Sequence, residues 1–108
     1  LDPSDEERDA IGLVWKQTNQ AVEDRSIGPA IVRDMLMYVT NRRHAGTDDL
    51  SERVTEAVIS YIFPQLEGVP ERKQIITHIA AVDATETETL RTAASDMLQV
   101  TIDTESDS

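Results

Sequence analysis

The chain has 108 residues, with 21 acidic and 10 basic side chains and a formal net charge of −11. This length fits a single domain, and a hydrophobic fraction of 39% with only 4% aromatic residues predicts an aliphatic core. The charge argues against binding to duplex nucleic acid or to an anionic membrane surface, because both would repel the chain. The absence of cysteine excludes disulfides and thiolate metal sites.

The basic residues are mostly arginine, and the only lysines are Lys16 and Lys73. An acidic, lysine-poor surface suits a salt-rich cytoplasm, because salt screens the repulsion between like charges. We therefore interpret the chain as a cytoplasmic protein of a halophilic organism; an ordinary acidic domain is the alternative. No apolar run has the length of a membrane span, and no signal peptide is visible. The chain starts at Leu1, which suggests a fragment of a longer protein or a processed chain.

The first predicted helix runs from about Asp5 to Asp24. It opens with a capping box, in which Ser4 and Glu7 satisfy each other's backbone amides. Apolar residues recur on one helical face at Ile11, Val14, Trp15 and Val22. Trp15 is interpreted as a core anchor rather than as a ligand contact.

The second predicted helix runs from Pro29 to about Arg43, after a turn at Gly28. Proline suits the first helical position, where no amide donor is needed. The apolar face of this helix consists of Ile31, Val32, Met35, Leu36, Tyr38 and Val39. Arg33 is a cation in its second turn, and the bases at positions 42–44 are expected to be a solvated cluster that matches the helix dipole.

The third predicted helix opens at residues 47–49 and ends near Phe63, because Pro64 cannot donate a backbone hydrogen bond. The loop that follows is unusually apolar. Phe63, Leu66 and Val69 are expected to pack against the bundle, and they are also the candidates for contact with a partner protein.

Two further helices complete the prediction, one from Pro70 to about Val82 and one that carries Leu90 and Leu98. Possible capping boxes at residues 83–86 and 85–88 predict a break near residues 83–85; a single kinked helix is the alternative. From Thr101 to residue 108 the chain is expected to be a disordered acidic tail. No segment alternates as a strand would, so the predicted fold is a single all-α domain of about five helices over residues 1–100, without a sheet.

The chain contains no recognisable catalytic motif. It has no phosphate-binding GxxxxGK[ST] loop, no GxGxxG and no GxSxG. His44 and His78 are far apart in sequence and form a poor set of metal ligands, and helix caps explain the acid pairs 6–7 and 48–49. The sequence therefore predicts neither an enzyme in its own right nor a metal or cofactor site.

Two segments give the chain a family resemblance. Ser26-Ile27-Gly28-Pro29 leads into a helix that begins Ala-Ile-Val-Arg-Asp-Met-Leu, and this resembles the C-terminal helical lid of AAA+ ATPases. The run over residues 57–68, where a helix enters Phe-Pro-Gln-Leu-Glu-Gly, is similar to the lids of the MoxR-like and McrB-like branches. The resemblance covers residues 7–68, and residues 70–100 would be a helical extension.

This resemblance implies that Gly28, Pro29 and Arg33 are nucleotide-sensing residues. In the family an arginine of the lid helix reaches the γ-phosphate, and it commonly follows the proline directly; here Ala30 has that position, and Arg33 lies one turn later. The alternative is that Arg33 is a surface arginine paired with Asp34. ATP and Mg²⁺ would be bound by an upstream domain of the same protein, which would form homo-oligomers and would involve neither nucleic acid nor membrane in this part.

Two other functions are compatible with the sequence. The chain could be a stand-alone acidic interaction or dimerisation module that docks a partner through Phe63, Leu66 and Val69. It could also be a helix-turn-helix protein in which Arg42, Arg43 and Arg53 contact phosphates. This last alternative ranks lowest because the surface is strongly acidic.

Overall fold

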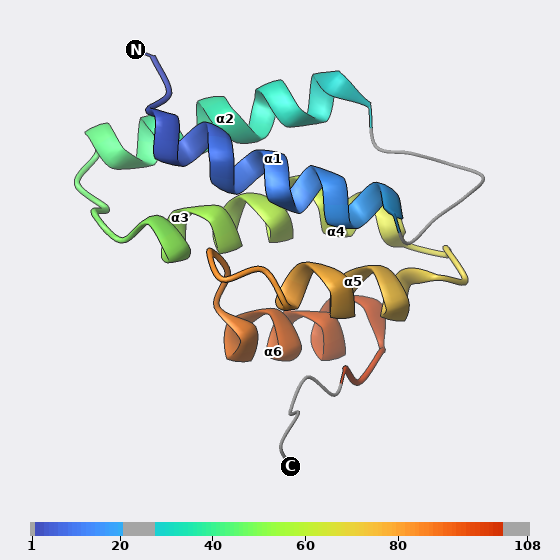
Figure 1. Ribbon diagram of the computed structural model, residues 1–108. Coiled ribbons are helices and arrows are strands. Elements are labelled where there is room, and N and C mark those ends of the chain that lie inside the picture. Colours follow the sequence, from blue (N-terminus) through green and yellow to red (C-terminus); the bar gives the residue numbers. More distant parts are fainter. Residues whose placement is uncertain (1, 21–27, 103–108) are drawn as a thin grey trace.

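The computed structural model describes residues 2–20 and 28–102, and in these residues the chain is all-α without strands (Figure 1). The predicted fold class is therefore confirmed. The elements are α1 (Asp5–Gln20), α2 (Pro29–His44), α3 (Leu50–Ala57), η1 (Val58–Ile62), α4 (Phe63–Leu66), α5 (Arg72–Ala80) and α6 (Thr87–Leu98). Because α3, η1 and α4 follow one another without a break, the described chain forms five helical rods.

The rods are arranged around α1 and the α3–η1–α4 rod. In Figure 1, α1 and α2 lie above that rod, and α5 and α6 lie below it. Helix α1 contacts α2, α3 and α5, and α6 contacts α4 and α5. The buried core is aliphatic, as predicted, apart from Phe63. Every helix contributes residues to this core, so the core extends through all layers of the molecule.

Helix α1 starts at the predicted capping box. The Ser4 amide donates to Glu7 Oε1 over 2.8 Å, and the Glu7 amide donates to Ser4 Oγ over 3.1 Å. The buried face of the helix consists of Glu7, Ala10, Ile11, Val14 and Thr18. Trp15 lies beside this face and is 40% exposed, so its prediction as a core anchor is wrong. The predicted end of the helix, residues 21–24, lies outside the described residues.

The third helix continues past its predicted end near Phe63 and reaches Leu66. The π-helical turn η1 precedes Pro64, and within it the Phe63 amide donates to the carbonyl of Val58, five residues back. Proline has no amide to donate, and the change from α to π spacing takes the chain through this position without ending the rod.

The break between the last two helices is confirmed, but the capping boxes predicted there are wrong. Glu86 is the N-cap of α6 and makes no side-chain cap bond. Thr85 instead donates its hydroxyl to the carbonyls of Ile79 and Val82 at the end of α5. The predicted tail also begins too early, because Ile102 is buried in the core. Residues 103–108 lie outside the described residues.

Candidate functional site

The first turn of α2 contains the residues that the family resemblance singles out. Gly28 is the N-cap, with φ −78° and ψ 169°, and no side chain caps the helix. Pro29 begins the helix, and its first turn contains no acidic residue. Gly28 and Arg33 are both exposed. In the part of the chain that the structure describes, both residues are therefore accessible at this end of α2, and the arginine lies close to the positive end of the helix dipole.

Arg33 differs from the other arginines of the described chain. Arg8, Arg42, Arg43, Arg53, Arg72 and Arg91 each bond or pair with a carboxylate or carbonyl oxygen. No such bond to Arg33 is formed within residues 2–20 and 28–102, and Arg33 does not pair there with its exposed neighbour Asp34. Its guanidinium therefore has no fixed role in the described part of the bundle.

The opposite end of α2 is held by a buried carboxylate. Glu7 is fully buried, and its Oε2 accepts bonds from Arg43 Nε at 2.9 Å and from Arg53 Nη2 at 3.1 Å. Its Oε1 accepts from the Ser4 amide at 2.8 Å and from Thr40 Oγ1 at 3.3 Å. We call Glu7, Arg43 and Arg53 the Glu7 cluster. It joins α1, α2 and α3 at one point.

Burial acts to raise the pKa of Glu7, but the Ser4 amide and the charges of Arg43 and Arg53 outweigh it, so the pKa is lowered from its ordinary value of 4.5. The carboxylate is therefore ionised at neutral pH. Arg53 is buried as well, and its Nη1 donates to the carbonyls of Thr47 and Asp48, each over 2.8 Å. The cluster is a structural joint between helices.

The Glu7 cluster corrects two predictions. Arg42, Arg43 and His44 do lie in the last turn of α2 and are at least partly exposed, as expected, but two of them are also paired, Arg42 with Glu56 and Arg43 with Glu7. Arg53 is 4% exposed and so is poorly placed to meet the phosphates of DNA. Sequence reasoning identified Glu7 only as a member of the capping box. The residues near Glu7 in the sequence do not indicate that its carboxylate pairs with Arg43 and Arg53, which are 36 and 46 residues away.

The predicted partner-contact residues are wrong as a docking surface. Phe63 is 0% exposed, Leu66 2% and Val69 3%, and all three belong to the core. Their apolar character serves the packing of α4 against α6 and the connection to α5. A partner could reach them only by unfolding this part of the molecule.

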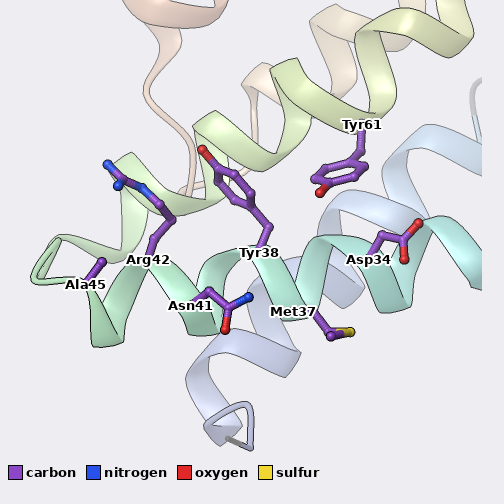
Figure 2. A pocket seen from close by; sticks show the side chains of 7 residues that line it. All are labelled: Asp34, Met37, Tyr38, Asn41, Arg42, Ala45 and Tyr61. Atoms are coloured by element: carbon purple, nitrogen blue, oxygen red, sulfur yellow. The ribbon is translucent and has the colours of Figure 1, made fainter.

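A shallow pocket lies instead on the outer side of α2. It has a volume of about 390 Å³ and is lined by Asp34, Met37, Tyr38, Asn41, Arg42, Ala45 and Tyr61. Figure 2 shows the two tyrosine rings between α2 and the neighbouring rod, with Asp34 and Arg42 toward opposite ends of the row along α2. The ring centroids are 5.8 Å apart and the planes meet at 72°, an edge-to-face contact.

The pocket walls are held in place by polar contacts. Tyr38 Oη donates to Glu56 Oε1 at 3.3 Å, and Arg42 Nε donates to the same oxygen at 3.0 Å. Burial and the Glu56 charge raise the pKa of Tyr38, so its hydroxyl remains a donor at neutral pH. Tyr61 comes from η1, and π-helical turns occur frequently at functional sites. Sequence reasoning did not identify this pocket.

No family model, curated protein or solved structure matches the chain. Within the described ranges, no three His, Asp or Glu side chains are grouped in a way that could hold a metal ion. None of the described helices has the length and apolarity needed to cross a membrane. Two surfaces of α2 are candidate sites, the N-terminal corner at Arg33 and the pocket at Tyr38 and Tyr61.

Proposed function

We propose that this chain is the C-terminal helical lid of an AAA+ ATPase, with the first turns of α2 facing a nucleotide bound by another domain of the same protein. The observation that supports this proposal is Arg33: it is exposed near the N-terminal end of α2, whereas the other described arginines bond to oxygens of this chain.

The electrostatics of this corner suit an anion. The N-terminus of a helix carries a partial positive charge, and in α2 neither an acidic residue of the first turn nor a capping side chain offsets it. Arg33 adds a full positive charge one turn further on. The neighbouring Asp34 is the nearest acid in sequence, and no ion pair with it draws Arg33 away.

The Glu7 cluster anchors α2, the helix that carries Arg33, to its neighbours. It fixes the C-terminal half of α2 to α1 and α3 through Arg43 and Thr40. An arginine on a helix anchored in this way is positioned more precisely than one on a loop. Arg33 would therefore move with the whole bundle, which is what a lid that closes as one body requires.

In the proposed mechanism the bundle covers the nucleotide and excludes water, and Arg33 supplies positive charge near the γ-phosphate. Such a cation stabilises the charge that develops during phosphoryl transfer. Loss of the γ-phosphate after hydrolysis removes the contact and lets the bundle open. The catalytic groups and Mg²⁺ ligands would belong to the nucleotide-binding domain, and the bundle would contribute to contacts between subunits.

The test is ATP turnover by the protein that contains this chain together with its nucleotide-binding domain. The Arg33→Ala variant should lower kcat by about 100- to 1,000-fold, the range for loss of one preorganised donor to the developing charge. Arg8→Ala is the matched control, because Arg8 is an exposed arginine on α1 with only a 3.8 Å contact to Asp5. Equal turnover in both variants would refute the proposed role of Arg33.

A further inference from the structure

The rod formed by α3, η1 and α4 does not keep one helical register along its length. If α spacing continued from Val54 to the end of the rod, Gln65 would lie within about 20° of Val54 on the buried side, and Phe63 would lie about 180° away. The structure has the reverse arrangement, because Gln65 is exposed and Phe63 is 0% exposed. The two halves of the rod are therefore out of α-helical register with each other.

The mismatch between the two halves amounts to one residue. With one residue fewer between them, Ile62 and Leu66 would each lie within about 20° of Val54, and Pro64 would lie about 180° away. This is the observed pattern, because Ile62 is 1% and Leu66 2% exposed and Pro64 lies on the surface. The π-helical turn absorbs the difference, since its amide-to-carbonyl bond spans five residues rather than four.

The extra residue also affects where Tyr61 lies. The Tyr61 side chain is half-buried, and its ring centroid is 5.8 Å from that of Tyr38. Figure 2 shows the Tyr61 ring between its own rod and α2. Ser60, the preceding residue, is exposed. If Ser60 were removed and the rod became one continuous α-helix, Tyr61 would take the exposed position that Ser60 has now.

We infer that η1 accommodates a one-residue insertion, with Ser60 as the extra residue, and that this insertion builds one wall of the pocket on α2 by turning Tyr61 toward Tyr38. Both halves of the rod keep their apolar faces in the core, and only the π-helical turn departs from α spacing. Turns of this kind occur frequently at functional sites. The inference does not depend on the lid function, because it involves no residue of the N-terminal corner of α2.

Pro64 offers a different explanation of the π-helical turn, since proline has no amide and its ring clashes with the carbonyl four residues back in an α-helix. The variant Pro64→Ala separates the two explanations. It should keep the turn, because α spacing would bring Gln65 to the buried side and Phe63 to the surface. Nuclear Overhauser contacts between the rings of Tyr38 and Tyr61 should therefore persist in this variant. Their loss would assign the turn to the proline and overturn the inference.

Deletion of Ser60 tests the insertion itself. It is made in the Pro64→Ala variant, because a proline inside a continuous α-helix is destabilising on its own. The deletion variant should unfold cooperatively in urea with a midpoint close to that of Pro64→Ala. Deletion of Thr92 in the same background is the matched control: Thr92 is also an exposed hydroxyl residue, but α6 is a continuous α-helix, so this deletion turns Ala94 and Leu98 out of register. The control should unfold at a much lower urea concentration. Equal losses in the two deletions would overturn the insertion.

The folded deletion variant also tests the role of the extra residue in the pocket. With Ser60 removed, the Tyr61 ring should turn toward solvent, and its nuclear Overhauser contacts to the ring of Tyr38 should disappear while the urea midpoint is kept. Loss of the ring contact in a stable protein is the result expected of a residue that shapes the pocket and is not needed for the fold. A stable deletion variant that keeps the ring contact would overturn the proposed role in the pocket.

Discussion

Arg42 and Arg43 are neighbours on α2, yet they take part in two very different ion pairs. Arg43 turns inward to Glu7, a carboxylate with no exposed surface, whereas Arg42 turns outward to Glu56, whose side chain is 30% exposed. Inside the protein an ion that loses its partner cannot be stabilised by water, while on the surface it can. Both pairs join α2 to another helix, but only the pair at Glu7 has a carboxylate without access to water.

Loss of the Glu7 charge should have the largest effect on stability. Glu7→Gln keeps the shape of the side chain but leaves Arg53 buried without a counter-ion. We expect the free energy of unfolding to fall by roughly 3–5 kcal/mol, the range for removing one partner of a buried pair. Urea denaturation followed by circular dichroism measures this change. Glu6→Gln is the matched control, because Glu6 is exposed and loses the same charge; similar losses in both would mean that the cluster is not a stabilising joint.

Acid should weaken the same cluster in a predictable pH range. The pKa of Glu7 is lowered below its ordinary value of 4.5, so the folded state binds this proton less readily than the unfolded state does. Its contribution to stability is therefore complete above about pH 4.5 and is lost as the pH falls through the folded pKa. Thermal unfolding between pH 6 and pH 3 should show a steeper loss for the unmodified chain than for Glu7→Gln. Parallel curves would contradict the lowered pKa.

The surface pair should contribute least. Glu56→Gln removes the charge opposite Arg42, but solvent can compensate both partners, so the midpoint of urea denaturation should move by only a small fraction of the Glu7→Gln shift. The effect should appear instead in the pocket on α2, where Glu56 holds Tyr38 and Arg42. A destabilisation as large as that of Glu7→Gln would show that burial does not distinguish the two pairs.

The all-α fold and most helix positions could be predicted from the sequence because their signals are local. The capping box joins Ser4 to Glu7, three residues apart, and Pro29 begins α2 where no amide is needed. The apolar spacing of α1 and α2 identified Ile11, Val14, Met35 and Val39 as buried, and the break between α5 and α6 was also foreseen. Each of these features depends on interactions within one or two helical turns.

The two candidate surfaces of α2 and the Glu7 cluster depend on tertiary contacts that the local sequence pattern does not indicate. The bonds from Glu7 to Arg43 and Arg53 span 36 and 46 residues, and Tyr38 meets Tyr61 across two helices. Packing also decided that Phe63 is buried while Trp15 is partly exposed. Local periodicity can state that a residue is apolar or charged, but which residue it faces depends on how the helices pack, and that is a property of the whole chain.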